Sequence, residues 1–455
     1  MDFPPEEKEN LLKYYTHTKQ RIDLNIDMNL EKVIGQTKLT FILNEEIEKQ
    51  FPENLFLYLN SENLFINNIQ LQIKNELVKE KNTNNQINNL IELKFTNTSP
   101  FYYYKSYLDQ LYGNIEELES FKNINRVEWE IRQKGNLIIT IPNKLIFPKN
   151  KNVDSLNKEN QSINKNNKMH HKIKIIINYE LIEKNIGIIF QEFYDSRADK
   201  FYKICYTPNF YYNTQSWVPC IYNLSLQINW SLYIYISNEY ICYSSLLLIQ
   251  ILKDVCGKKL MINKTNEPTT ARNIGFIIIN DKILKRYYDE NNKNFIIIAN
   301  ENNKEKIEKY LINNKLIGTL YNYYFEFFDI NRDNIKPMPI TSIIFIPYLL
   351  INTPSENLEK FLKLKEDNYL NFIKFPNLYI LPEKFIYNES IPEISKFQLR
   401  TISKLFINNY IGGLIIEKTY ADFWIINGLE TWLSNLFLNK VFGNQYIKAK
   451  IYKWM

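Results

Sequence analysis

Apolar and polar residues alternate along much of the first half of the chain. Segments 22–27 and 39–43 each place an apolar side chain at every second position. A period of two is typical of a strand with one face buried and the other in solvent. Gly35 lies between the two segments, so the pattern predicts a β-hairpin that turns at Gly35.

The same alternation continues further along and predicts a large antiparallel β domain over residues 1–240. Two Asn- and Lys-rich stretches, near 79–89 and 149–169, lack periodic apolar residues and are predicted surface insertions. His170 and His171 close the second stretch, and their spacing fits no helical metal pair. Further strands are predicted at 55–59, 64–71, 136–141, 173–179 and 230–237.

The second half, residues 241–455, mixes the two periodicities and predicts an α/β domain. The short apolar runs 274–279, 294–298 and 378–381 indicate buried strands. Segments 305–316 and 355–364 have helical spacing, the second with Ser355 or Thr353 near an N-cap position. The fold class predicted for the whole chain is therefore α+β, with at least two domains.

The last segment has the most regular helical pattern. Ile402, Leu405 and Phe406 share one face, and the Gly412-Gly413 pair is a typical helix stop. A second helix is predicted from a cap at Asp422 to a stop at Gly443. Its apolar stripe is expected at Leu429, Trp432, Leu433, Leu436, Phe437 and Val441.

Composition narrows the class of protein. The chain has 455 residues, 45% of them hydrophobic and 15% aromatic, which is enough for two or three packed cores. The net charge of +6 is spread along the chain without a dense basic stripe. The four cysteines form no CxxC pair, the first residues are acidic rather than apolar, and no apolar run reaches membrane-spanning length. These features favour a reducing intracellular compartment.

The helix pair resembles the signature of the gluzincin aminopeptidases. In that family a HExxH helix ends in WFG, and a WxDxWLxEGxA segment follows. In the stretch 411–433 here, Gly412 stands at the WFG glycine, and Asp422, Trp424 and Gly428 match the Asp, Trp and Gly of the second segment without a gap.

The zinc chemistry is missing at the matching positions. Lys404 and Asn408 stand where the two histidines would be, Leu405 stands at the general base, and Asn427 stands at the third ligand. Catalytic zinc needs about three protein ligands and an open position for water. A protonated lysine offers no lone pair, a leucine accepts no proton, and amides are weak zinc ligands. The resemblance therefore implies a pseudoenzyme with no catalytic residues, no metal and no cofactor.

Three upstream blocks resemble one inactive branch of the family, TBP-associated factor two of the general transcription factor IID. They are 16–41, 215–237 with its Pro219-Cys220 pair, and 270–279. The resemblance implies an aminopeptidase-like, saddle-shaped N-terminal β domain and a thermolysin-like domain that is incomplete at residue 455. It also implies a nuclear scaffold in RNA polymerase II initiation.

The partners implied are TBP, TBP-associated factors one and eight, and core-promoter DNA bound with little sequence specificity. The DNA-contacting residues are not predicted. Arg126, Arg132 and Lys134 are candidates for phosphate contact, with a solvated loop as the simpler interpretation.

Two alternatives stay open. One is a degenerate aminopeptidase-family scaffold or peptide-binding protein outside transcription. The other is a hydrolase with a different site, for which the sequence offers no P-loop, no GxSxG motif and no adjacent Cys/His pair. His17, the remaining histidine, precedes a predicted strand and is expected to be a surface or packing residue.

Overall fold

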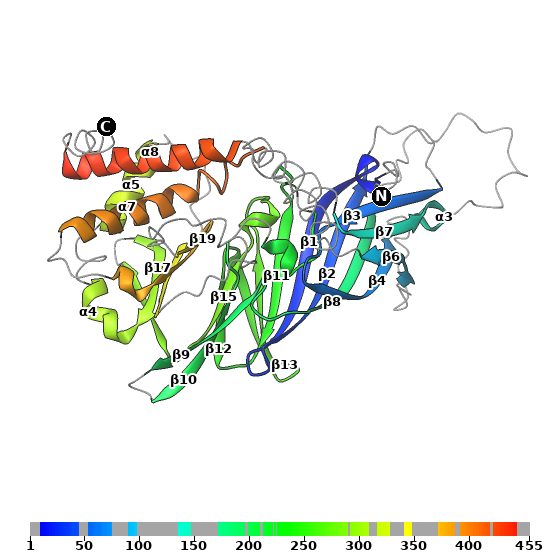
Figure 1. Cartoon of the computed structure of the whole chain (residues 1–455), viewed down its shortest axis with the longest axis horizontal. Coiled ribbons are helices and arrows are strands. Elements are labelled where there is room, and N and C mark those ends of the chain that lie inside the picture. Colours follow the sequence, from blue (N-terminus) through cyan, green and yellow to red (C-terminus); the bar gives the residue numbers. More distant parts are fainter. Residues whose placement is uncertain are drawn as a thin grey trace, which may run out of the picture.

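The computed structural model is β-rich, with several sheets and few helices (Figure 1). It describes residues 10–44, 53–74, 90–97, 135–146, 172–195, 199–209, 213–221, 223, 225–289, 292–308, 316–327, 341–347, 372–386, 392–418 and 422–443. The predicted insertions, His170, His171, the predicted helix 355–364, and Arg126, Arg132 and Lys134 lie outside these residues.

The predicted N-terminal hairpin is confirmed, but its turn lies elsewhere. β1 (Tyr15–Asp27) and β2 (Lys32–Leu43) pair antiparallel. The turn forms just after Asp27, whose carboxylate accepts hydrogen bonds from the backbone N–H groups of Asn29 and Leu30 at 2.9 and 3.0 Å. The prediction of a turn at Gly35 is wrong. Gly35 lies within β2, where a Cβ atom would fall 2.2 Å from the Tyr179 ring, so this glycine makes room for a buried aromatic side chain.

The hairpin is the centre of an eight-stranded sheet with the order β13-β14-β11-β1-β2-β8-β4-β5. The prediction of an antiparallel sheet holds except at one pair, because β1 and β11 run parallel. A parallel pair needs a crossover instead of a hairpin, and β11 reaches β1 only after several other strands have intervened. The other strands of this sheet are β4 (Leu64–Lys74), β5 (Leu90–Glu92), β8 (Lys172–Leu181), β11 (Asn229–Ile236), β13 (Leu247–Val255) and β14 (Lys258–Lys264).

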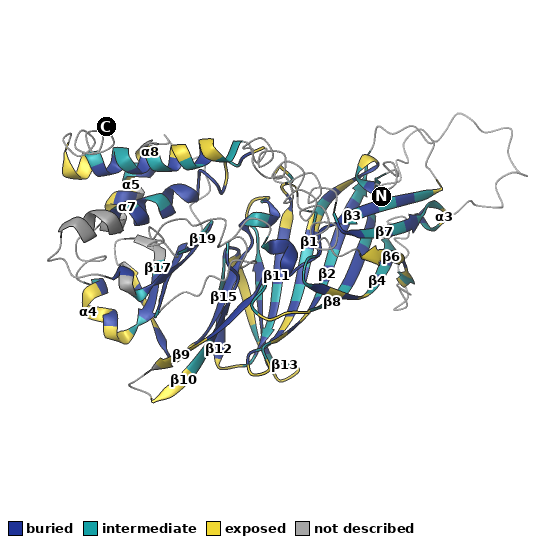
Figure 2. Ribbon diagram, in the orientation of Figure 1, coloured by how far each residue is buried: buried dark blue, intermediate teal, exposed yellow. Residues whose placement is uncertain are grey.

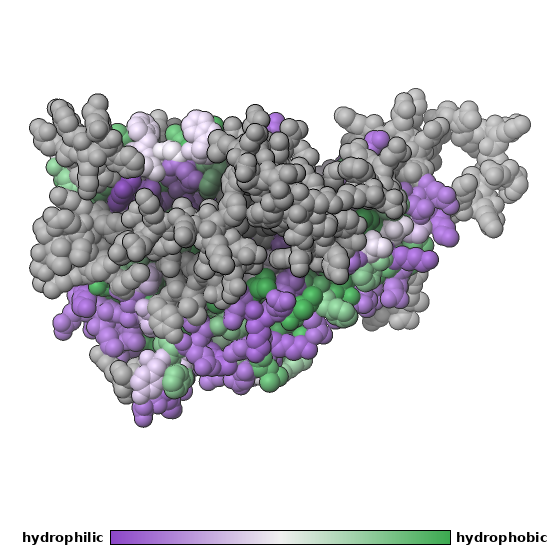
Figure 3. Space-filling view, viewed as in Figure 1, coloured by the Kyte–Doolittle hydropathy of each residue, from purple (hydrophilic) through white to green (hydrophobic). Residues whose placement is uncertain are grey.

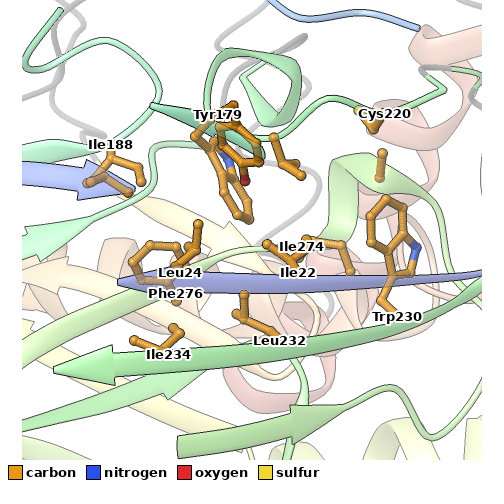
Figure 4. Packing of buried hydrophobic residues seen from close by; sticks show 14 of the residues in the cluster. Ile22, Leu24, Tyr179, Ile188, Cys220, Trp230, Leu232, Ile234, Ile274 and Phe276 are labelled. Carbon is orange, nitrogen blue, oxygen red and sulfur yellow. The ribbon is translucent and has the colours of Figure 1, made fainter. Parts of the chain in front are cut away.

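Two smaller sheets share one hydrophobic core with it, and one face of the five-stranded sheet described below joins the same core. Trp217, Trp230 and Tyr179 are among the largest fully buried side chains of this core. Figure 4 shows Phe276 near Leu24, and these two side chains come from different sheets. The three-stranded sheet consists of β3 (Asn54–Leu59), β6 (Lys94–Asn97) and β7 (Leu137–Pro142), and the short helix α3 (Asn143–Ile146) follows β7. The four-stranded sheet consists of β9 (Ile189–Asp195), β10 (Lys200–Tyr206), β12 (Tyr240–Ser244) and β15 (Phe276–Asn280).

Strand pairing continues past residue 240. β13 and β14 extend the eight-stranded sheet, and β15 pairs with both β10 and β12. The strand predicted at 274–279 is therefore confirmed, but it joins the first half rather than the second. The division into two domains stays a prediction. A boundary at residue 240 would separate paired strands, whereas a boundary after Asn280 would keep them together.

The second half forms a five-stranded mixed sheet with the order β16-β17-β18-β20-β19. The central strands run parallel, and the two edge strands are antiparallel. The strands predicted at 294–298 and 378–381 are confirmed. Their bounds are β16 (Leu284–Asp289), β17 (Asn292–Asn300), β18 (Thr341–Ile346), β19 (Ile373–Phe375) and β20 (Leu378–Pro382).

Helices pack against this sheet and enclose a second hydrophobic core. Figure 1 shows α7 (orange) and α8 (red) lying together on one side of it. The helix predicted at 305–316 is described only at its two ends, which belong to different helices. The helices are α4 (Lys304–Ile307), α5 (Leu316–Phe327), α7 (Pro392–Asn408) and α8 (Phe423–Phe442). None of the described helices has the length and apolarity needed to cross a bilayer.

Candidate functional site

The predicted C-terminal helix pair is confirmed. α7 starts at Pro392, a residue whose fixed φ suits the first helical position. It ends at Asn408, before the Gly412-Gly413 pair rather than at it. The loop then turns back on itself, because the Gly412 N–H donates to the Ile415 carbonyl at 2.7 Å. Asp422 stands at the N-cap of α8, but its side chain makes no capping hydrogen bond there.

The buried face of α8 differs from the predicted stripe. Leu433 and Phe437 are buried as expected, whereas Leu429, Trp432 and Val441 are exposed (Figure 2). α8 carries apolar side chains on several sides, so periodicity alone could not choose the buried one. The buried face also holds two polar residues, Glu430 and Ser434.

The α7 residues at the predicted site point to two different environments. Leu405 is fully buried in the core between the helices and the sheet, and its carbonyl accepts a hydrogen bond from the Tyr379 hydroxyl. Lys404 instead reaches α8, where its Nζ donates to the Thr431 hydroxyl at 3.0 Å. Asn408 is buried, one turn further along α7.

A buried ion pair lies beside these residues. Lys374 of β19 places its Nζ 2.7 Å from both carboxylate oxygens of Glu430 on α8. The Glu430 side chain is only 5% exposed, and Lys374 is 21% exposed, so the charges are largely removed from water. Asn427, the predicted third position, lies one turn before Glu430 and is half-buried. Sequence reasoning missed this pair, because Lys374 lies outside the quoted motif and Glu430 falls at the motif's final alanine position, which carries no chemistry in the family.

Gly412 brings the loop against the same group of residues. A Cβ at this position would lie 2.8 Å from the Asn408 Oδ1 and 3.6 Å from the Glu430 Oε1. The backbone φ of Gly412 is +106°, a value that residues with side chains rarely adopt. Asn408 and Glu430 therefore both approach one glycine, and only a residue without a side chain fits there.

The charges around Lys404 are mostly positive. Burial lowers the pKa of Lys404, and the nearby cations Arg400 and Lys374 lower it further, while Glu430 opposes them. Two cations and one carboxylate thus act on Lys404, and the carboxylate already pairs with Lys374. Such a group repels a dication instead of attracting it. No group of three or more His, Cys, Asp or Glu side chains with metal-binding geometry occurs among the residues that the structure describes.

The loop between the helices is also fixed to the β-rich part of the chain. The Asn273 amide donates to the carbonyls of Gly412 and Gly413 at 3.3 and 3.4 Å. Arg272 forms an ion pair with Glu417, whose side chain is 1% exposed. Arg272 and Asn273 both belong to the segment 270–279. The sequence of this segment resembles the inactive branch of the family, but it does not predict these contacts with the loop.

The structure thus brings Lys404 and Asn408 beside Lys374 and Glu430, while Leu405 faces the core. For Asn427 it shows a position on α8 but no hydrogen bond that links it to the other three. The arrangement can hold the helix pair, the loop and the edge strand β19 together. The four predicted positions carry a lysine, a leucine and two asparagines, and no imidazole or carboxylate.

Fold and site together define a β-rich chain of several sheets, in which an ion pair joins the edge strand β19 to helix α8. No known family profile matches it. One stretch of 82 residues is 29% identical to "Transcription initiation factor TFIID subunit 2" of Schizosaccharomyces pombe. That stretch covers 18% of this chain and 7% of the yeast protein, so the similarity spans a small part of either.

Proposed function

We propose that this chain is a non-catalytic scaffold subunit of a general transcription factor IID that supports RNA polymerase II pre-initiation complex assembly. The observation that carries the proposal is the 82-residue similarity to a TFIID subunit 2. The proposed fold is that of an aminopeptidase-like pseudoenzyme, with a saddle-like β domain followed by a peptidase-like domain. The mixed sheet with its packed helix pair is compatible with that fold.

The side chains at the former zinc positions support the absence of zinc chemistry. Hydrolysis through zinc needs imidazole or carboxylate ligands and a base that takes a proton from water. Lys404 donates its hydrogen bond to Thr431, and Leu405 lies in the apolar core. The nearby carboxylate, Glu430, is held by Lys374. Each of these side chains makes a packing or polar contact within the fold, whereas a zinc hydrolase would need a metal ligand or a base at the matching positions.

The proposed partners are TBP and TBP-associated factors one and eight, and the proposed location is the nucleus. Core-promoter DNA is a further proposed ligand, contacted through phosphates with weak sequence preference. The net charge of +6 allows such contacts. Binding of this kind weakens steeply as salt rises, because each neutralised phosphate releases counterions.

Reconstitution tests the scaffold function. The whole chain is co-expressed with TBP-associated factors one and eight, and the mixture is separated by size-exclusion chromatography with TBP added. Co-elution in a stable complex is expected. A chain that elutes apart from all three proteins contradicts the proposal and favours the alternative, a peptide-binding member of the aminopeptidase family outside transcription.

A second measurement tests the pseudoenzyme. Elemental analysis of the purified chain should find no stoichiometric zinc, and aminopeptidase substrates should not be turned over. An Asn408→Ala variant is the matched control for contaminating activity. Turnover that disappears in this variant would assign real catalysis to the site and overturn the proposal.

A further inference from the structure

β13 is an open edge of the eight-stranded sheet, and it is apolar. It pairs with β14 on one side, and no described strand lies on its other side. Its side chains Leu247, Leu248, Ile249 and Ile251 are 38%, 44%, 52% and 40% exposed. Figure 3 shows hydrophobic green atoms along the lower side of the molecule, where Figure 1 places β13.

The usual protection of an edge strand is weak here. Natural edges carry charges or proline because their free N–H and C=O groups otherwise pair with other chains. The six residues 247–252 carry neither, and Lys253 and Asp254 come only at the far end of the strand. Successive side chains of a strand point to opposite faces, so the exposed run is apolar on both faces.

We propose that the free edge of β13 binds an extended segment of a partner protein, which adds to the sheet as a further strand. A row of free backbone donors and acceptors is complementary to another strand and not to a helix. An uncharged run gives no attraction to nucleic-acid phosphates. The partner segment must therefore be extended and apolar on both faces.

The shape of β13 favours a free segment over a second copy of this chain. Its register with β14 shifts between Leu248 and Gln250 and again between Leu252 and Val255. Such bulges bend and twist a strand. A flexible segment follows that twist as it binds, whereas two folded copies would need to match two bulged edges rigidly.

A peptide with the sequence of β15, residues 276–280, is the probe. β15 is a buried strand without a charged side chain, and its apolar residues point to both faces, as the partner segment requires. The labelled peptide is titrated with the whole chain and followed by fluorescence anisotropy. Binding is expected, together with slower hydrogen exchange at the β13 amides.

Two variants distinguish peptide binding at the β13 edge from non-specific binding to any exposed apolar side chain. Ile251→Lys places a charge on the edge and is expected to weaken peptide binding at least ten-fold. Phe65→Lys is the matched control, because Phe65 is 62% exposed on β4, an interior strand between β8 and β5. It should leave binding unchanged. Circular dichroism checks that both variants keep their β content, and Ile249→Lys replaces Ile251→Lys if that variant loses it.

Three results would overturn the proposal. One is no binding of the peptide to the unaltered chain. Another is equal weakening by Ile251→Lys and Phe65→Lys, which would show non-specific apolar contact. The third is a dimer in sedimentation equilibrium that Ile251→Lys dissociates, because a second copy would then occupy the edge.

Discussion

Lys374 and Glu430 are both largely buried in the folded chain. Burying either charge without the other would cost a large amount of folding free energy. Their attraction and hydrogen bonds offset the loss of hydration only while both are present. The pair also joins β19 to α8, two elements far apart in the sequence. A change at either residue therefore tests whether this contact maintains the packing of the helix pair.

Lys374→Met should destabilise the chain by about 3 kcal/mol, because it leaves the Glu430 carboxylate buried and unpaired. The double variant Lys374→Met with Glu430→Leu should return to within about 1 kcal/mol of the parent. Urea denaturation measures both. The control is Lys304→Met, whose partner Glu308 is exposed, with an expected change below about 0.5 kcal/mol. Equal losses at Lys374 and Lys304 would contradict the prediction.

His17 has a different role from any the motifs suggest. It is buried and stacks on Phe41 with ring centroids 4.8 Å apart, so the expectation of a packing residue is confirmed. Burial lowers its pKa from 6.5 to about 4. The folded chain therefore keeps this imidazole neutral at pH values where the unfolded chain already protonates it.

His17 should make the chain less stable in mild acid. The loss of unfolding free energy caused by His17 is small above pH 6.5 and grows as pH falls toward 4. It reaches about 2 kcal/mol near pH 5. Denaturation of the parent and of His17→Phe at pH 7.5 and pH 5 measures it. The variant should lose less stability on acidification than the parent. Identical losses would show that His17 does not titrate in this range.

At the scale of elements, regular alternation was sufficient to predict most strands of the first half. β13 was missed because 247–252 is apolar except at Gln250 and shows no period of two. The turn of the first hairpin was misplaced because Gly35 serves side-chain packing with Tyr179, a contact between distant residues. The Lys374–Glu430 pair was out of reach for the same reason, since neither residue is unusual locally.

Two glycines of the helix pair should respond oppositely to alanine. Gly412→Ala introduces a side chain at a positive φ and against Asn408, so it should destabilise by about 1–3 kcal/mol. Gly428→Ala lies within α8 with open space around it, so it should stabilise by about 0.5–1 kcal/mol. Thermal unfolding measures both. Changes of the same sign would contradict the described loop or the described helix.

At the scale of the whole molecule, few specific polar contacts join the β-rich part to the helix pair in the described residues. Arg272 reaches Glu417, and Asn273 reaches the backbone of the glycine loop. Arg272 also lies over the Phe423 ring, with its guanidinium carbon 5.5 Å from the centroid. One short segment therefore positions the start of α8.

Arg272→Leu should loosen the loop before it affects the sheets. Amide exchange at residues 411–415 should accelerate at least ten-fold, because the buried Glu417 loses its charge partner while exchange in β1 stays unchanged. Arg286→Leu is the control, since Arg286 pairs with Asp281 at an exposed site. Exchange that rises equally in both variants would contradict a specific connection.

The parallel pairing of β1 with β11 has a consequence for synthesis. β1 leaves the ribosome well before one of its two neighbours, β11, which begins only at Asn229. At roughly 5–20 residues per second, a gap of about 200 residues corresponds to roughly 10–40 s of translation. Throughout that interval the β1 edge of the nascent hairpin stays uncovered. Chaperone binding to ribosome-bound chains should therefore persist until β11 emerges, and then decline.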